Sequence, residues 1–277
     1  MKNIYEPEKV KIIGIEKLSS NVSRFRLASP KPGKSVFKAD ENGLVFNPGQ
    51  FLLFGLFGWG EAPFGAASSP YEKRYLDLVV RKAGVLTEKL HQLKEGDEAF
   101  LRGPYGNGFP VDFMSGKDVV MVTGGCGIPP IAALIEYIIK NRGDFGNVYL
   151  IYGARTPADL LMMDAIKKWE KDIKVLLTVD KPDKNWKGYV GMVSELIDDI
   201  KINAVDAVAA MCGPGPMMEA LEKILRPLGI ADRRIFVNVE RKMQCGLGKC
   251  QHCATGSKYV CQDGPVFNFD EIDKNHD

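Results

Sequence analysis

The stretch that decides the fold class is Asp118-Val-Val-Met-Val-Thr-Gly-Gly-Cys-Gly-Ile-Pro-Pro130, where an apolar run passes through a glycine turn. Residues 118–123 have the continuous apolar character of a strand covered on both faces, and residues 131–140 have helical spacing. Similar units follow, with strands expected at 148–152, 174–179, 207–211 and 234–239 and helices at 157–169 and 216–228. Strands that alternate with helices predict a parallel α/β sheet.

Upstream of this stretch the rhythm of the sequence is different. Short apolar or alternating runs at 10–15, 22–27, 50–54, 76–81 and 99–102 are separated by Gly, Pro, Asn and Ser clusters, with one helical segment at 86–93. This spacing is typical of a β-barrel or sandwich. A length of 277 residues suits two domains with a small addition. We expect a β-barrel domain over 1–112, an α/β domain over 113–239, and a C-terminal lobe over 240–277 that ends in a polar tail from Asp270.

Composition and charge exclude several classes of protein. The 37 Lys and Arg residues nearly balance the 35 Asp and Glu residues, and no basic block stands out, so nucleic-acid binding is not expected. The longest strongly apolar stretch, residues 51–59, is far shorter than the ~20 residues of a membrane span. The N-terminus lacks the apolar run of a secretory signal, which predicts a cytoplasmic protein without membrane insertion.

Four of the six cysteines, namely Cys245, Cys250, Cys253 and Cys261, lie close together near the C-terminus. Four residues separate the first pair, two separate the second pair, and seven precede the last cysteine. This spacing is typical of plant-type [2Fe-2S] ligation, and glycines within the loop allow backbone N–H groups to face the sulfurs. The alternative is a structural zinc site, although zinc sites usually show paired CxxC units and only one occurs here. We expect His252, Cys126 and Cys212 to lie outside the ligand set.

Two glycine-rich turns follow strands of the predicted α/β sheet. The first, residues 122–130, could bring backbone amides and a helix N-terminus to a pyrophosphate, and the second is residues 211–218. The first turn departs from the GxGxxG fingerprint at Pro130, so a plain turn remains the alternative. In the N-terminal part, Phe64 beside small residues could stack on a planar ring, and the turn at residues 84–87 opens a helix that could hold phosphate. Taken alone, these are also ordinary hairpin residues.

The order of the motifs resembles a known superfamily. APFGAASS (62–69) and GVLT (84–87) precede GPYGNG (103–108), TGGCGIPP (123–130), YGART (152–156) and MCGPGPMM (211–218). In this order the chain resembles the ferredoxin-NADP reductase superfamily over nearly its whole length. The cysteine segment makes it similar to the γ (diaphorase) subunits of cytosolic NAD(P)-linked nickel-iron hydrogenases. The corresponding subunit of anaerobic sulfite reductase and the dihydroorotate dehydrogenase electron-transfer subunit are close relatives, but the seven-residue gap before Cys261 favours the hydrogenase or sulfite reductase branch.

The resemblance implies a cofactor site for each domain. The arginine, aromatic and serine segment that holds FAD in the family falls on Ala62, Phe64 and Gly65, and only the aromatic residue is retained. The flavin phosphates would then depend more on Arg81, the turn amides and Thr87. The implied FAD residues are Phe64, Gly65, Ala66, Arg81, Gly84, Val85, Leu86 and Thr87. The implied nucleotide residues are Gly124, Gly125, Gly127, Arg155, Cys212, Gly213 and Pro214, with Cys212 beside the nicotinamide. Because no acidic residue stands at the strand end beside Arg155, NADH and NADPH both remain possible.

The implied activity is an NAD(P)H-dependent flavoprotein oxidoreductase, in which two electrons enter FAD as a hydride and leave singly through the [2Fe-2S] cluster. Hydride passes directly between cofactors, so we name no protein acid or base. Since the sequence shows no substrate-reducing centre, the expected partners are catalytic and iron-sulfur subunits of a larger redox complex, most consistent with a nickel-iron hydrogenase or a sulfite or sulfur reductase. Three alternatives are a dihydroorotate dehydrogenase subunit, a stand-alone NAD(P)H:flavin reductase and a zinc-stabilised binding module.

Overall fold

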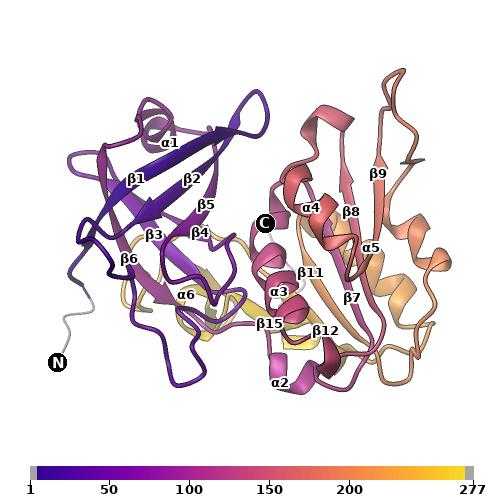
Figure 1. Cartoon of the computed structure of the whole chain (residues 1–277). Helices are drawn as coiled ribbons and strands as arrows, with labels where there is room; N and C mark the ends of the chain where they lie inside the picture. The colour runs from indigo at the N-terminus through magenta and orange to yellow at the C-terminus, as the bar shows by residue number, and fades with distance from the viewer. Residues whose placement is uncertain (1–4, 272–277) are drawn as a thin grey trace.

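The computed structural model describes residues 5–271 and contains two sheets that lie side by side (Figure 1). The N-terminal sheet is antiparallel, with the order β4-β3-β6-β1-β2-β5. An isolated bridge between Ala66 and Leu78 joins the chain after β4 to β5 and so brings the two sheet edges together. Alternate side chains such as Phe25, Leu52 and Phe54 are fully buried inside. The predicted β-barrel is therefore confirmed. Its strands are β1 (Glu8–Lys17), β2 (Val22–Ala28), β3 (Phe51–Leu56), β4 (Gly60–Gly65), β5 (Leu76–Arg81) and β6 (Glu98–Tyr105).

The second sheet has the order β10-β9-β8-β7-β11-β12-β15 and is parallel except for its last strand. Alternate residues of β7 enter two apolar clusters, one shared with α3 and α4 and the other with α5. Helices thus cover both faces, as the alternating pattern predicts. Its strands are β7 (Val119–Gly124), β8 (Val148–Ala154), β9 (Lys174–Val179), β10 (Tyr189–Val190), β11 (Val208–Cys212), β12 (Ile235–Asn238) and β15 (Val266–Asn268). The helices are α1 (Val85–Leu90), α2 (Val111–Met114), α3 (Ile128–Lys140), α4 (Met163–Trp169), α5 (Gly215–Leu225) and α6 (Val260–Asp263).

The helix expected at 157–169 is wrong over its first half. The segment begins with a single 3-10 turn, Pro157–Asp159, and the α-helix starts only at Met163 after Met162 adopts a left-handed φ of 57°. A tertiary contact causes the break, because the N–H of Leu161 donates to the hydroxyl of Tyr152 at 2.9 Å. Tyr152 in turn donates to the carbonyl of Gly125 at 3.1 Å. The interruption therefore connects this segment to the glycine turn after β7.

The C-terminal segment is attached to both sheets. It forms the small hairpin β13 (Ala254–Thr255) and β14 (Lys258–Tyr259), then α6, then β15, which pairs antiparallel with β12. The barrel side meets it through the loop after β6. There Gly106 lies so close to the segment that a Cβ would stand 2.3 Å from the carbonyl oxygen of Gly264. In Figure 1 the yellow segment passes beneath the junction of the two halves.

Two expectations concern the ends and the surface of the chain. Most of the polar tail predicted from Asp270 falls outside the residues that the structure describes. Between residues 5 and 271, no helix has the length and apolar character that crossing a membrane requires.

Candidate cofactor and nucleotide site

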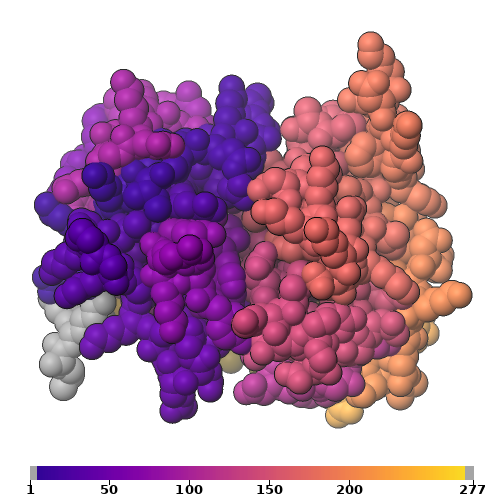
Figure 2. Space-filling view, viewed as in Figure 1, coloured from indigo at the N-terminus to yellow at the C-terminus, as the bar shows by residue number. Residues whose placement is uncertain are grey.

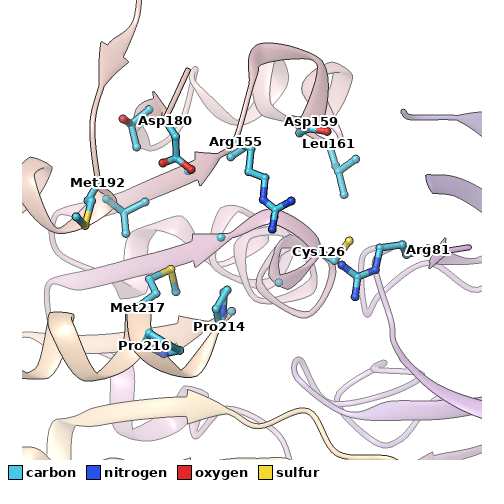
Figure 3. A pocket seen from close by; sticks show the side chains of 18 of the residues that line it. Arg81, Cys126, Arg155, Asp159, Leu161, Asp180, Met192, Pro214, Pro216 and Met217 are labelled. Carbon is cyan, nitrogen blue, oxygen red and sulfur yellow. The ribbon is translucent and has the colours of Figure 1, made fainter. Parts of the chain in front are cut away.

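A cavity of about 720 Å³ lies between the barrel and the α/β sheet, at the carboxyl ends of β7, β8 and β11 (Figure 3). The space-filling view shows the two halves meeting along a groove (Figure 2). The barrel contributes the β1–β2 turn at Asn21 and the side chain of Arg81. The α/β half contributes both predicted glycine turns. The cavity therefore occupies the position in which open α/β sheets bind ligands.

The cavity collects most of the predicted nucleotide residues. Six of these line it directly, and Arg81 joins them from the predicted flavin set. The six are Gly124, Gly125, Gly127, Arg155, Gly213 and Pro214. Cys212 lies just beneath the surface and is fully buried, and this burial raises the pKa of its thiol well above its ordinary value.

The turn after β7 has the geometry of an anion site. Helix α3 begins at Ile128 directly after the glycines, and no side chain within the described chain caps it. A Cβ on Gly127 would lie 2.3 Å from the carbonyl oxygen of Cys212, so this turn tolerates only glycine there. The hydroxyl of Thr123 is buried beneath the turn and has no hydrogen-bond partner among the described residues. Pro129 and Pro130 supply no N–H, so the backbone amides of the glycine turn before the helix, together with the unpaired buried hydroxyl, are the groups that fit a pyrophosphate at this place.

The predicted flavin residues are spread along the barrel. Phe64 packs edge-on against Phe54, with 6.1 Å between ring centroids. Gly65 faces α3, because a Cβ there would lie 3.2 Å from Cδ of Pro130, and Ala66 is buried. Apart from Arg81, none of the predicted flavin residues lines the cavity.

Thr87 has a clear local role. Its hydroxyl accepts hydrogen bonds from the N–H groups of Ala83 and Gly84 at 2.8 and 2.9 Å and donates to the carbonyl of Gly84 at 2.9 Å. These bonds fix the turn that starts α1, where Val85 is 65% exposed. Thr87 is thus a capping residue, and its hydroxyl is used in hydrogen bonds to the backbone of Ala83 and Gly84. The turn that it stabilises contains Gly84, Val85 and Leu86.

The cysteine loop directs backbone N–H groups at its sulfurs. The Sγ of Cys245 accepts from the N–H groups of Leu247, Lys249 and Cys250 at 3.3 to 3.4 Å, and the Sγ of Cys261 accepts from Gly248 at 3.0 Å. Burial alone would raise the pKa of the Cys245 thiol, but these N–H groups lower it to about 6. At Cys245 these bonds stabilise the thiolate, which is the ligand form that iron-sulfur clusters require. Burial and the neighbouring Cys253 instead raise the pKa of the Cys261 thiol, despite the bond from Gly248.

The four cysteines differ in exposure. Cys253 and Cys261 are buried, Cys245 is half-buried, and Cys250 is exposed beside an exposed His252. Among residues 5–271, no group of three or more His, Cys, Asp or Glu side chains surrounds one point closely enough to hold a single metal ion. The fit to a cluster rests on the four thiols and on the N–H···S bonds.

The cysteine loop packs against the barrel next to the predicted flavin segment. Arg102 on β6 donates to the carbonyl of Cys245 at 3.2 Å, and a Cβ on Gly246 would lie 2.9 Å from the side chain of Leu53 on β3. Strand β3 pairs directly with β4, with Phe51 opposite Gly65. The cysteine loop and the flavin segment therefore contact neighbouring strands, which lie about 4.8 Å apart, although Leu53 faces the cysteine loop while Phe64 faces the barrel interior.

Comparison with known proteins assigns each part of the chain. Residues 9–109 match an oxidoreductase FAD-binding domain, and residues 121–223 match an oxidoreductase NAD-binding domain. Residues 240–273 match the iron-sulfur cluster binding domain of dihydroorotate dehydrogenase B. The gamma subunit of sulfhydrogenase 1 from Pyrococcus furiosus is 36% identical, over 98% of this chain and 93% of the relative. The chain belongs to the ferredoxin-NADP reductase-like family of electron-transfer subunits.

Other members of this family and its structures agree. A probable dihydroorotate dehydrogenase B electron transfer subunit from Thermococcus kodakarensis is 37% identical, over 86% of this chain and 91% of its own. A structure described as the NADH-dependent reduced ferredoxin-NADP oxidoreductase, studied for flavin-based electron bifurcation, has a TM-score of 0.76. It is 26% identical and covers 96% of this chain and 90% of that chain. The predictions of FAD, NAD(P) and iron-sulfur binding are confirmed, and the zinc-stabilised module is replaced by the iron-sulfur assignment.

Three acidic residues that line the cavity were not identified from the sequence. Asp180 directly follows β9 and Asp159 lies in the 3-10 turn after β8, so both carboxylates flank Arg155 (Figure 3). The expectation of no acidic residue at the strand end beside Arg155 considered only that residue's own strand, and it did not consider these two carboxylates. The position of Asp180 at the end of the next parallel strand was the available signal.

Glu240 is the third of these residues. It lines the cavity although it precedes the cysteine segment, and its side chain is exposed there, within the electrostatic influence of Arg81. Desolvation by the surrounding protein raises the pKa of its carboxyl, and the charge of Arg81 partly offsets this increase. Its location depends on how the chain leaves β12, which no local pattern indicates.

Proposed function

We propose that this chain is the electron-transfer subunit of a nickel-iron hydrogenase or of a sulfite- or sulfur-reducing complex, with a [2Fe-2S] cluster held by Cys245, Cys250, Cys253 and Cys261. It exchanges electrons in either direction between NAD(P)H, FAD and catalytic and iron-sulfur partner subunits. The proposed domain ranges are 1–112 for FAD, 113–239 for the nucleotide and 240–277 for the cluster. A reducing cytoplasm suits the four unpaired thiols.

The observation that carries this proposal is the position of the cysteine loop against β3, the strand that pairs with the predicted flavin segment. When bound, a flavin accepts a pair of electrons from a nicotinamide and releases them singly to a one-electron centre. The chain's own residues supply positioning. The amides after Gly124 and the side chain of Arg81 bind phosphate, and Gly127 lets the turn approach β11.

The test separates flavin reduction from delivery of electrons. In Cys250→Ser the native complex should keep NAD(P)H-dependent reduction of its flavin in stopped-flow measurements but lose reduction of the partner's substrate. His252→Ser, at an exposed position two residues away, is the matched control and should keep both. Loss of flavin reduction in Cys250→Ser alone would contradict the proposed order of carriers.

A dihydroorotate dehydrogenase subunit is the second candidate, because the cysteine segment matches the cluster-binding domain of that enzyme. Isolation of the native complex through a tag on this chain distinguishes the two. Hydrogen uptake or sulfur-compound reduction by the isolated complex supports the first candidate, and oxidation of dihydroorotate supports the second. A chain isolated alone, active only with free flavin, would instead be a flavin reductase.

A further inference from the structure

Two large aromatic side chains project from the turn between β3 and β4. Phe57 is 74% exposed and Trp59 is 48% exposed. Phe57 is not isolated, because its ring meets Phe100 of β6 edge-on with 3.9 Å between centroids. Trp59 lies beneath the ammonium of Lys89, 4.5 Å from the ring centroid. Single exposed apolar residues are ordinary, whereas neighbouring ones on a fixed turn are typical of contact surfaces.

This aromatic group continues into the surface of the cysteine loop. Phe100 and Arg102 are two residues apart on β6, so they project from the same face of the strand about 6.6 Å apart. Arg102 donates to the carbonyl of Cys245. On the other side of the loop, the ring of Tyr5, which is 45% exposed, lies 5.1 Å from the Nζ of Lys249. We call Tyr5, Phe57, Trp59 and Phe100 the aromatic margin.

The cysteine loop beside this margin has an excess of cationic side chains. Residues 241–263 contain four cationic side chains, Arg241, Lys242, Lys249 and Lys258, against the single carboxylate of Asp263. Asp263 accepts a hydrogen bond from the N–H of Tyr259 at 2.6 Å. On the barrel side, the carboxylate of Glu61 is paired with Arg102. The whole chain carries a formal charge of only +2, so this excess is local.

Cys250 lies within the basic loop and is the exposed member of the four thiols. An electron leaving a cluster crosses least protein at its exposed corner, so a partner must cover this corner to receive it. A covering surface would also meet the cations and the aromatic margin. Aromatic residues at a contact supply most of the binding energy, and charges of opposite sign speed the encounter.

We propose that the aromatic margin and the basic cysteine loop form the docking surface for an acidic iron-sulfur protein, which carries carboxylates around an apolar recess for Phe57. This inference rests on the proposed function and identifies the chemistry of the partner surface. The basic loop steers the partner to Cys250, and the rings of the β3–β4 turn hold it there.

The experiment uses the full chain with its cofactors and two protein acceptors of opposite charge, an acidic ferredoxin and basic cytochrome c. Phe57→Ser should raise the KM for ferredoxin about tenfold. Lys249→Glu and Lys242→Glu should raise it by a similar factor, weaken its dependence on salt, and leave or improve reduction of cytochrome c. Lys242 is included because its amide is not among those that donate to the sulfurs. Visible spectra establish equal cluster content in all variants.

The matched controls lie on the α/β half of the molecule. Val205→Ser removes an apolar side chain that is 78% exposed, and Lys187→Glu reverses an exposed charge. Neither should change the KM for ferredoxin. Reduction of ferricyanide by NAD(P)H should remain unchanged in Phe57→Ser, Lys242→Glu and both controls, since this small acceptor needs no docking surface.

Two failures are distinguishable. The docking surface is refuted if Phe57→Ser has the same KM for ferredoxin as Val205→Ser, and if both cysteine-loop variants have the same KM as Lys187→Glu. The proposed function would still stand. If the wild-type chain loaded with its cofactors does not reduce ferricyanide with either nucleotide, the proposed function itself fails.

Discussion

Asn107 is the residue that we expect to hold the cluster-binding segment in place. Its Nδ2 donates to the carbonyls of Asp263 and Val266 at 3.1 and 2.7 Å, and its Oδ1 accepts from the N–H of Val266 at 3.0 Å. Its own backbone N–H donates to the carbonyl of Gly264 at 2.6 Å. One side chain from the barrel half thus binds the chain between the last cysteine and β15.

Substitution of Asn107 by Ala removes the three side-chain bonds and keeps the backbone bond. At a net value of about 1 kcal/mol for each bond, the loss is about 3 kcal/mol. Val266 is only 4% exposed, so water cannot readily replace the lost partner of its N–H. A loss of this size is within the stability of a domain, which is about 5 to 15 kcal/mol, so the protein should still fold. Asn107→Asp keeps one acceptor but places a carboxylate oxygen against the carbonyls of Asp263 and Val266, so its loss should exceed the roughly 2 kcal/mol of the two missing bonds.

The assay is hydrogen exchange resolved along the chain, together with the rate of iron loss to a chelator. A local loss of about 3 kcal/mol should accelerate exchange of amides in residues 260–268 by about a hundredfold and should speed iron release. Asn42→Ala, at an exposed position in the loop between β2 and β3, should change neither. Unchanged exchange at 260–268 in Asn107→Ala would refute the reasoning that this side chain fixes the segment.

Two further predictions concern the cavity. Gly127→Ala should weaken binding of NAD(P)H at least tenfold in fluorescence titrations, because its Cβ would stand 2.3 Å from the carbonyl oxygen of Cys212. The control Gly143→Ala, whose Cβ meets nothing within 4 Å, should bind NAD(P)H normally. Equal affinities of the two variants would show that the turn at Gly127 has room for a side chain. Glu240→Gln tests the raised pKa of this carboxyl. The protonated form is favoured on folding, so the wild-type apoprotein should lose stability as pH rises from about 4.3 through the raised pKa, and the variant should show a flatter unfolding profile from pH 4 to 8. Identical profiles would contradict the raised pKa of Glu240.

The parts of the fold that the sequence predicts correctly are those with strong local patterns. The run 118–123, its glycine turn and the following helix are a single local unit, and β7 and α3 occupy that place. The sequence predicts that this helix starts at residue 131, after Pro129 and Pro130. Helix α3 begins earlier, at Ile128, because proline suits the first turn of a helix. The cysteine spacing is also local, since one loop supplies all the N–H···S bonds to Cys245.

The parts that the sequence could not predict depend on distant contacts. Strand β15 has three residues, too few for a periodic pattern, and it exists because β12 offers an edge. The helix break at Met162 involves the hydroxyl of Tyr152, and the position of Glu240 on the cavity wall depends on the packing of the barrel opposite it. The proximity of Asp180 to Arg155 follows from strand order, which the alternation of strands and helices leaves open.

The contacts that join the two halves of the molecule differ in strength. On the side of the cysteine loop, Asn107 binds the C-terminal segment, and Asn238 of β12 donates to the carbonyl of Gly49 at 2.9 Å in a buried position. Between β2 and α4, the ion pair of Arg24 with Asp164 at 2.9 Å connects the halves. Because Asp164 is 45% exposed, that pair contributes about 0 to 1 kcal/mol. The bonds that hold the cysteine segment do not involve this pair, so the thiols should keep their position against β3 when the pair is broken, as in Asp164→Asn.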